Sequence, residues 1–410
     1  MKKSTLAVFA ALATLVVLFQ NCGQHRTLDT DQSSATLPLK SSLESIMMDA
    51  KSEAGSLASS TSSIDTCPEV LRVRNSSADA SSLLQNCFDR ASGKTLELAA
   101  GVYTLKKRVR IQGPIRIRTQ GTGSNPIRCS SNDANCATFK AANNDDYTNN
   151  QSERGLFLIR GANVHLQSLI FDGDQKNRFS SRLASACRLG ENGSGTLVNF
   201  DAASSSIRGS VFKRAICGSS LTVGRNDILI EQNRFEENGL NSETGLWADG
   251  LTMGEVQSAT IQDNLFHNNT DVHMVMGGCT NCRVLRNSFT HDSNVHQASF
   301  AALVLHRWHT GQSGSYTGTL VEGNTIDCGP SFLCGHALAL GADAWSVGLS
   351  AFGGTLRSNT ISNAVIGFQI DELIGGVEIH DLRILTYASG NLACHNSSVR
   401  LPAAAVNIAP

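Results

Sequence analysis

Three copies of one phrase lie between residues 230 and 289: Ile230-Glu-Gln-Asn-Arg-Phe235, Ile261-Gln-Asp-Asn-Leu-Phe266 and Val284-Leu-Arg-Asn-Ser-Phe289. Each copy has an apolar residue, two variable positions, an Asn, one variable position and a second apolar residue. The phrase recurs at 321–326 and 356–361, and without its Asn at 207–212 and 379–384. Between the closing residues 212, 235, 266, 289, 326, 361 and 384 the separations are 23, 31, 23, 37, 35 and 23. A basic period of 23 residues with insertions indicates a repeat protein.

A second short run, with apolar residues at alternate positions, precedes each of the Asn-containing phrases that begin at residues 261, 284, 321 and 356. One more such run precedes the phrase without Asn at 379–384. These runs contain Leu251/Met253, Met274/Met276, Leu303/Leu305, Leu338/Leu340 and Phe368/Ile370. Alternation with period two is typical of strands. Two or three short strands in each turn of the repeat, with no helical period, predict the coils of a parallel β-helix stacked about 4.8 Å apart. We expect the Asn residues to stack at one turn position and to be structural rather than catalytic.

The start of the repeat region supports the same fold. Residues 79–91 are similar to the short amphipathic helix that caps the first coil of right-handed parallel β-helix proteins of the pectin-lyase-like superfamily, and residues 94–105 resemble the first two strands of that superfamily. The resemblance covers about residues 67–395. It implies an all-β, single-stranded right-handed parallel β-helix, or solenoid, with a short N-terminal capping helix.

The same resemblance does not identify a reaction, because this solenoid serves lyases, hydrolases, epimerases, adhesins and inert scaffolds. The polygalacturonase-like series Asn-x-Asp, Asp-Asp and Gly-His-Gly is not found in the sequence, and Asn269-Thr-Asp271 is an isolated fragment of it. The Asp-Pro-His motif of alginate epimerases is also not found. These differences from known catalytic motifs weigh against every enzyme hypothesis.

Length and charge fit one elongated exported domain. A solenoid grows in one dimension, so 410 residues predict one such domain rather than several globular ones. The 34 Lys and Arg residues balance the 35 Asp and Glu residues, which argues against a nucleic-acid partner. The predicted segments are a signal peptide at 1–22, a Ser/Thr-rich tether with an amphipathic helix at 23–65, the β-helix at 66–395 and a C-terminal tail at 396–410.

The first 22 residues resemble a bacterial lipoprotein signal. Lys2 and Lys3 precede an apolar run of about 14 residues, which is too short to span a bilayer. The resemblance implies that Cys22 becomes the lipidated N-terminus, and Gly23 after it implies sorting to the outer membrane of a Gram-negative bacterium. The membrane is then contacted through the lipid anchor only. The alternative is a plain secretory signal, since Gln20 and Asn21 stand where small residues are usual.

Cysteines of an exported chain are expected to form disulfides. The sequence has 12 cysteines, and besides Cys22 most of them fall into close pairs. Cys394 has no such neighbour. The predicted pairs are Cys67–Cys87, Cys129–Cys136, Cys187–Cys217, Cys279–Cys282 and Cys328–Cys334.

Two long loops give the most specific functional signal. The segment between an alternating strand and the next phrase has six residues in three coils, but 14 residues at 306–319 and 341–354. These two loops belong to consecutive coils and are therefore expected at the same edge. They carry His306, Arg307, Trp308, His309, Asp343 and Trp345, and the next coil contributes Asp371 and Glu372 at the same place.

Such a set of side chains predicts a polysaccharide site, because Trp308 and Trp345 offer flat apolar faces to sugar rings. For glycoside hydrolysis the carboxyl pair is Asp343 with Asp371 or Glu372. For β-elimination or epimerisation of a uronate, Arg307 neutralises the carboxylate and His306 or His309 takes the proton. The alternatives are a non-catalytic surface adhesin or an envelope scaffold, in which the two Trp bind glycan or bury the loops on the solenoid.

A weaker candidate lies at the start of two neighbouring strands. Asp249 and Asp271, with His273 close by, have oxygens that calcium would accept as ligands, although Asp at a turn start needs no ligand to explain it. Calcium is the only cofactor that the sequence suggests. On the same strands the outward Val275, Val304 and Ala339 are apolar, which predicts that this face is covered by the N-terminal helix or by a partner. The sequence does not set the oligomeric state.

Overall fold

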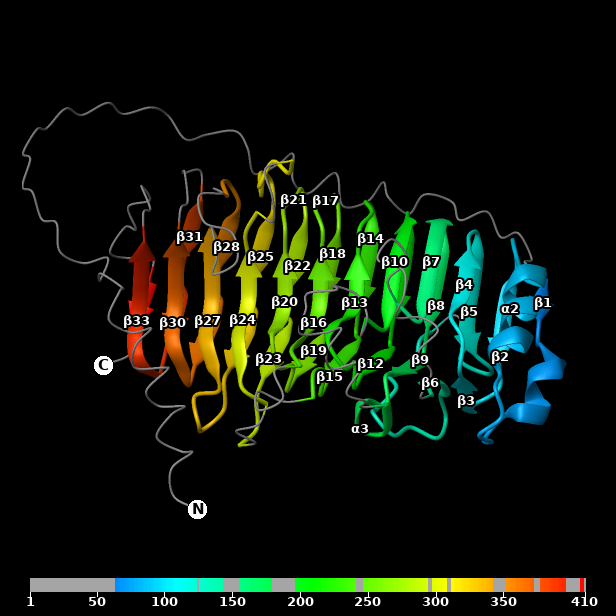
Figure 1. Ribbon diagram of the computed structural model, residues 1–410. Coiled ribbons are helices and arrows are strands. Elements are labelled where there is room, and N and C mark those ends of the chain that lie inside the picture. The colour runs from blue at the N-terminus through cyan, green and yellow to red at the C-terminus, as the bar shows by residue number, and fades with distance from the viewer. Residues whose placement is uncertain are drawn as a thin grey trace, which may run out of the picture.

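The computed structural model describes residues 63–123, 125–142, 155–178, 196–240, 246–293, 297–307, 311–341, 351–371, 377–395 and 406–408. In these ranges the chain winds into one elongated solenoid that runs from the α2 end to β33 (Figure 1). Every strand pairs with its neighbours in parallel across three long sheets, and in the described coils the chain passes through sheets A, B and C in turn. The predicted parallel β-helix is confirmed.

Sheet A has ten strands in the described part of the chain, and it carries the residues discussed below. They are Val109–Gln112 (β4), Phe157–Ala162 (β7), Val198–Ala203 (β10), Gly218–Val223 (β13), Ala248–Met253 (β16), Val272–Met276 (β20), Ser299–Leu305 (β24), Cys334–Gly341 (β27), Ala364–Asp371 (β30) and Tyr387–His395 (β33).

Sheet B contains the first strand of each Asn phrase. Its strands are Ile64–Asp65 (β1), Thr95–Leu98 (β2), Ile115–Thr119 (β5), Val164–Gln167 (β8), Ser205–Arg208 (β11), Ile228–Glu231 (β14), Thr260–Gln262 (β18), Arg283–Leu285 (β22), Leu320–Glu322 (β25), Thr355–Arg357 (β28) and Glu378–His380 (β31). A separate pair of strands, Val256–Gln257 (β17) and Cys279–Thr280 (β21), lies between sheets A and B along the chain.

Sheet C contains the strand that closes each phrase. Its strands are Gly101–Leu105 (β3), Ala137–Ala141 (β6), Leu169–Asp172 (β9), Val211–Lys213 (β12), Arg234–Glu236 (β15), Leu265–His267 (β19), Ser288–Thr290 (β23), Thr325–Asp327 (β26), Thr360–Ser362 (β29), Leu382–Ile384 (β32) and Val406–Ile408 (β34). The helical segments of the described residues are Pro68–Val73 (η3), Ser81–Arg90 (α2) and Gln175–Arg178 (α3).

The Asn of each phrase occupies the turn between sheets B and C. Asn233, Asn264, Asn287, Asn324 and Asn359 are all buried and stack in one column. The Nδ2 of Asn264 donates to the Oδ1 of Asn287 at 2.9 Å and to the backbone carbonyl of Ile230 at 2.9 Å. Because each amide satisfies buried polar groups of two coils, the column is structural, as predicted.

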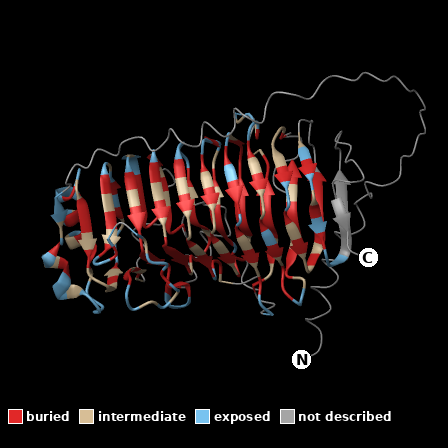
Figure 2. Cartoon of the chain, turned by 180° about the vertical axis from the view of Figure 1, so that it is seen from behind, coloured by how far each residue is buried: buried red, intermediate tan, exposed pale blue. Residues whose placement is uncertain are grey.

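The apolar residues that close the phrases form the interior of the solenoid. Neighbouring rings of Phe171, Phe212, Phe235, Phe266 and Phe289 have centroids 4.7 to 5.3 Å apart and are tilted by 12° or less. The alternating residues predicted to face inward, such as Leu251 and Met253, belong to the same core. Figure 2 shows buried residues along the whole described length of the solenoid.

The N-terminal end is closed by α2. This helix buries Leu84, Cys87 and Phe88 against the first coils, and the Phe88 ring lies edge-on to Phe139 at 6.4 Å. The predicted capping helix is therefore confirmed. Strand β1 begins two residues before the predicted start of the domain at 66, and β34 pairs with β32 beyond the predicted end at 395.

Four predicted disulfides are present: Cys67–Cys87, Cys129–Cys136, Cys279–Cys282 and Cys328–Cys334. Cys217 is also disulfide-bonded, while Cys187 and the side chain of Cys394 lie outside the described part of the chain. The predicted signal peptide with Cys22 and nearly all of the tether also fall outside it. Among the described helices, none is long and apolar enough to cross a bilayer.

Candidate functional site

The ends of the two long loops lie side by side, as predicted. The strands before them, β24 and β27, pair with each other, and so do the strands after them, β25 and β28. The backbone N–H of Tyr316 donates to the carbonyl of Phe352 at 2.8 Å, which joins the end of the first loop to the end of the second. The Tyr316 hydroxyl donates to the carbonyls of Met276 and His306.

Only part of the predicted loop site is described. His306 is fully buried and Arg307 is partly buried at the end of β24. The backbone of Asp371 ends β30 and pairs with Gly341. Five residues and one side chain lie outside the described residues: Trp308, His309, Asp343, Trp345, Glu372 and the side chain of Asp371. The loop site therefore stays a prediction, and the burial of His306 does not favour a direct contact of its ring with substrate.

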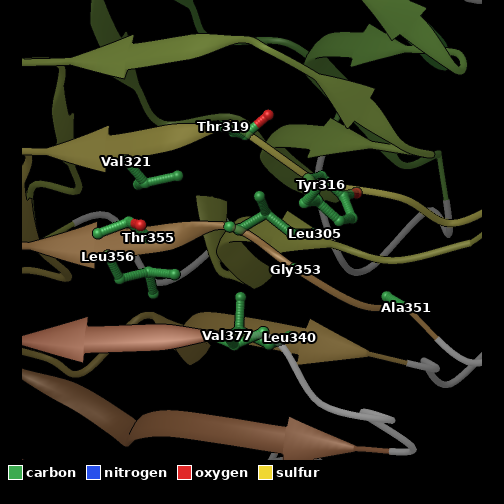
Figure 3. A pocket seen from close by; sticks show the side chains of 11 residues that line it. Leu305, Tyr316, Thr319, Val321, Leu340, Ala351, Gly353, Thr355, Leu356 and Val377 are labelled. Atoms are coloured by element: carbon green, nitrogen blue, oxygen red, sulfur yellow. The ribbon is translucent and has the colours of Figure 1, made fainter.

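A small apolar pocket lies beneath the two loops (Figure 3). It encloses about 10 Å³, roughly the space of one water molecule. No carboxylate or histidine is among its lining residues, which are Leu305, Tyr316, Thr319, Val321, Leu340, Ala351, Gly353, Gly354, Thr355, Leu356 and Val377. The pocket is too small and too apolar to hold a sugar.

The second candidate pair, Asp249 and Asp271, lies at the opposite edge of sheet A. Asp249 is the second residue of β16, and Asp271 immediately precedes β20. The backbone N–H of Phe300, on β24, donates to the carbonyl of Asp271, so these two residues lie side by side on neighbouring strands. His306 is six residues after Phe300 along the chain. At about 3.3 Å per residue, the two candidate sites are therefore about 20 Å apart along the strand direction. They cannot form one catalytic centre.

Gly250 shows which way the neighbouring Asp249 faces. A Cβ on Gly250 would lie 3.1 Å from the Phe266 ring and 2.5 Å from the carbonyl of His273, so this position points into the core. Leu251 is also in the core. Because two consecutive residues face inward, the strict alternation is interrupted, and Asp249 is placed on the outer face together with Thr252.

Asp249 is held by two hydrogen bonds. The Thr252 hydroxyl donates to its Oδ2 at 2.6 Å, and the backbone N–H of Val272 donates to its Oδ1 at 3.1 Å. Thr252 in turn contacts the hydroxyl of Ser219. Asp271 is positioned through its backbone, since its N–H donates to the Ala248 carbonyl and its carbonyl accepts from the N–H of Phe300.

The environment changes the acidity of both carboxyl groups. Burial raises the pKa of Asp249 well above its ordinary value, and the neighbouring Asp271 carboxylate raises it further. The hydrogen bonds from Thr252 and Val272 lower it only in part. Burial raises the pKa of Asp271 to about 6. Both carboxyls therefore hold a proton more strongly than ordinary aspartates do, which is a property of many acid–base groups.

Two aromatic residues are close to the carboxyl pair along the chain or through the backbone. Trp247, two residues before Asp249, is 38% exposed although it is large and apolar. Phe300, which follows Asp271 in register, is partly buried and its ring lies 5.1 Å from that of His336. Burial lowers the pKa of His336 to about 4, so this imidazole is neutral. An exposed aromatic face beside two carboxyls suits a sugar ring.

Sequence reasoning singled out Asp249 and Asp271 only as a weak cation site and missed Trp247, Thr252 and Phe300. The signal for Trp247 was its position two residues before Asp249. The outward Val275 and Val304 are fully buried and Ala339 is partly buried, while the predicted cover by the N-terminal helix or a partner stays a prediction, because that helix lies outside the described residues.

Calcium binding at Asp249 and Asp271 stays a prediction. Raised pKa values make the two carboxyls poorer ligands for a cation, because a protonated carboxyl binds metal weakly. Among the described residues, two groups approach to the distance of a metal site, His273–His291–Cys334 and Cys67–Glu69–Cys87. Both contain a disulfide-bonded cysteine, which is not available as a thiolate ligand.

Comparison with known proteins identifies the fold. The sequence matches no protein-family model and no curated protein. Among solved structures, endo-xylogalacturonan hydrolase from Aspergillus tubingensis is 13% identical, with a TM-score of 0.51 over 81% of this chain and 92% of that chain. PfbA, a surface adhesin of Streptococcus pneumoniae, is 11% identical, with a TM-score of 0.47 over 83% of this chain and 94% of that chain.

Polygalacturonase from Erwinia carotovora ssp. carotovora is 12% identical, with a TM-score of 0.46 over 82% of this chain and 95% of that chain. Identities this low show the fold and leave the activity open. With three parallel sheets, stacked coils and a capping helix, this chain has the right-handed parallel β-helix fold, which it shares with endo-xylogalacturonan hydrolase.

Proposed function

We propose that this protein is a polysaccharide hydrolase whose catalytic carboxyls are Asp249 and Asp271. The observation that supports the proposal is the pair itself: two neighbouring carboxyls at the starts of β16 and β20, with Asp249 held by Thr252 and Val272, and with the pKa of both groups raised by burial, that of Asp271 to about 6. A fold that needs only structural acids has no reason to bury two of them together, since burial without a basic partner is costly.

In the proposed mechanism, protonated Asp249 donates its proton to the oxygen of the glycosidic bond as the bond breaks. Ionised Asp271 acts on the opposite side, either as the base for an attacking water or as the nucleophile. Trp247 binds a sugar ring through its exposed face. Thr252 orients the carboxyl of Asp249 through the hydrogen bond to Oδ2.

The test is an assay of the full-length protein on a panel of acidic and neutral polysaccharides, following new reducing ends. We expect Asp249→Asn and Asp271→Asn each to lower the rate at least about 100-fold, the usual range for an acid–base group. Asp263→Asn is the matched control, because Asp263 lies on the surface in an ion pair with Arg286. Chelation of calcium is expected to leave the rate unchanged.

Two other results would replace this mechanism. Unsaturated products, detected by ultraviolet absorbance, would indicate a lyase and direct attention to Arg307 and the predicted loop site. Binding of a glycan without any cleavage would favour the adhesin alternative. Retention of full activity by both Asp variants would exclude the carboxyl pair as the catalytic site.

We also propose that the protein is exported and anchored to the outer membrane through a lipid on Cys22. The disulfides of the β-helix support export, because such bonds persist in oxidising compartments. We expect Cys22→Ser to move the protein from the membrane fraction to the soluble fraction of the producing cells. A variant that stays in the membrane fraction would show that Cys22 is not the anchor.

A further inference from the structure

A serine and a histidine are hydrogen-bonded at the turns that lead from sheet C into sheet A. Asn268 and His291 directly follow the paired strands β19 and β23, and Ser299 begins β24. The Oγ of Ser299 lies 2.9 Å from the Nε2 of His291, and the Nδ1 of His291 lies 3.2 Å from the Oδ1 of Asn268. A hydroxyl, an imidazole and an acceptor that orients the imidazole, in this order, are the parts of an activated nucleophile.

The hydrogen bonds of Asn268 determine the tautomer of His291. The Nδ2 of Asn268 donates to the Oδ2 of Asp292 at 2.9 Å, and the backbone N–H of Asp292 donates to the Oδ1 of Asn268 at 3.2 Å. That oxygen can only accept, so the Nδ1 of His291 carries the hydrogen. The Nε2 of His291 is left with the lone pair that accepts the hydroxyl hydrogen of Ser299, which is the tautomer that a general base needs.

The tautomer of His273 is determined in the same way. The Nδ2 of Asn238 donates to the Oδ1 of Asn269 at 2.7 Å, and the Nδ2 of Asn269 donates to the carbonyl of Phe235 at 3.1 Å. This Nδ2 also lies 2.8 Å from the Nδ1 of His273, which therefore accepts. The hydrogen of His273 is on Nε2, which has no partner among the described residues although the ring is fully buried. A buried N–H without an acceptor is costly and calls for an explanation.

His273 lies beside the Ser299–His291 pair. The centroids of the two imidazole rings are 4.5 Å apart. One nitrogen of each ring lies within 4.8 Å of the other and of the sulfur of Cys334, and Cys334 pairs in register with Ser299. A nucleophile, a base and a fixed N–H donor are therefore gathered at one turn, as acyl transfer requires.

Both imidazoles are neutral. Burial, together with the neighbouring His267, lowers the pKa of His291 to about 3, so the lone pair of Nε2 is available at neutral pH. Burial, with His291 and His267, also lowers the pKa of His273 well below its ordinary value. A neutral imidazole N–H can polarise a carbonyl group. A base with so low a pKa gives slow turnover, so the covalent intermediate is the sensitive quantity to measure.

We propose that Ser299 is the nucleophile of an esterase site, with His291 as its base, Asn268 as the residue that positions the imidazole and His273 as the donor to the carbonyl oxygen. Ser299 is 7% exposed and His291 is 6% exposed, so the site takes an ester of a small carboxylic acid, such as an acetyl ester. This activity is separate from the proposed cleavage of glycosidic bonds and does not depend on it.

In the first half of the reaction the Oγ of Ser299 bonds to the acyl carbon, and its proton passes to the Nε2 of His291. The carbonyl oxygen takes up the electron pair and accepts the N–H of His273. The ester C–O bond then breaks, and the leaving alcohol receives the proton from His291. In the second half, water attacks the acyl group through the same steps, which releases the carboxylic acid and restores the hydroxyl of Ser299.

The first experiment treats the full-length protein with p-nitrophenyl acetate. We expect a rapid release of nitrophenolate before slow turnover, and an acetyl group on Ser299 in peptide mass spectra. Ser299→Ala is expected to lose both. The matched control is Ser288→Ala on β23 of the same coil, a partly buried residue outside the site, which is expected to react like wild type. Equal release by wild type and Ser299→Ala, including none from either, would overturn the proposal.

The second experiment separates catalysis from folding through His273→Phe. Phenylalanine fills the same buried position without an unsatisfied N–H, so we expect a melting temperature equal to or above that of wild type. The rate of acetylation is expected to fall at least about 100-fold, as it does when an oxyanion donor is removed. Acetylation at the wild-type rate would overturn the assignment of His273.

The third experiment tests Asn268 through Asn268→Gly, because Asn268 has a φ of 53° that glycine adopts without strain. Loss of the acceptor frees the His291 ring to adopt the other tautomer. We expect kcat on p-nitrophenyl acetate to fall about tenfold with KM unchanged, since Asn268 does not contact the ester. An unchanged kcat would show that Asn268 does not position the base.

Discussion

At the scale of single residues, the candidate site is set by the hydrogen bonds and the burial of Asp249. Its neighbour Gly250 faces the core, where any side chain would meet Phe266 and the His273 backbone, and Asp249 itself is on the outer face. There Asp249 is nearly buried, with 9% exposure, and lies close to Asp271. The raised pKa values are consequences of that placement rather than of the residue types.

The raised pKa of Asp271 predicts how stability depends on pH. Its folded pKa of about 6 lies above the ordinary value of 3.8, so the folded state favours the protonated form. This contribution is fully present below about pH 4 and is lost as the pH rises through 6. Asp271→Asn removes the group that ionises, and we expect the variant to be more stable than wild type at pH 8 by about 3 kcal/mol, and nearly equal to it at pH 4.

Urea unfolding at pH 4 and pH 8 measures this difference. Asp263→Asn is again the control, because Asp263 is on the surface, and its substitution should change the free energy of unfolding by less than about 1 kcal/mol at either pH. A gain of stability for Asp271→Asn that is the same at both pH values would contradict the raised pKa. A gain only at pH 8 would show that the site carries a charge at a cost in stability, as active sites often do.

At the scale of elements, the two long loops and the carboxyl pair lie at opposite edges of sheet A. The loops leave sheet A at the ends of β24 and β27, and the carboxyl pair lies at the starts of β16 and β20. A polysaccharide long enough to reach both would be bound by the loops and cleaved at the pair. Under the proposed function the loops would act as an accessory binding region, whereas the sequence predicts both carbohydrate binding by their two Trp residues and catalysis there.

This role predicts that Trp308→Ala and Trp345→Ala weaken binding of long polysaccharide by about tenfold each, since a stacked aromatic face contributes roughly 1 kcal/mol or more. Cleavage of a small aryl glycoside is expected to stay unchanged. Trp247→Ala provides the contrast, because its loss should reduce cleavage of both substrates. The measurements are isothermal titration on polymer and initial rates on the small substrate. Unchanged polymer binding in both loop variants would assign the two Trp to burial of the loops.

At the scale of the whole molecule, stability and function use different parts of the same coils. The interior is built from the Phe stack and the Asn column, which join each coil to the next. Each coil therefore depends chiefly on its neighbours, as in other repeat proteins. The outer-face side chains of β10, β13 and β16 do not form the interior of the solenoid, so polar residues there do not weaken the core.

The sequence by itself determined the solenoid. Its period, its alternating strands, the Asn column, the capping helix and four of the cysteine pairs all depend on contacts between residues one coil apart, and one-coil spacing is visible in the chain as a repeat. The adjacency of the two long loops was predicted for the same reason, because loops of equal position in consecutive coils must emerge together.

Only the tertiary structure decided which carboxyls are chemically unusual. Asp249 and Asp271 are 22 positions apart in the sequence and look like ordinary turn residues. Their acidity depends on burial and, for Asp249, also on the nearby Asp271, Thr252 and Val272, and none of these is encoded in a local pattern. The desolvation of a carboxyl depends on all the groups that surround it, so its effect on the pKa can be assessed only once the coils are stacked in three dimensions.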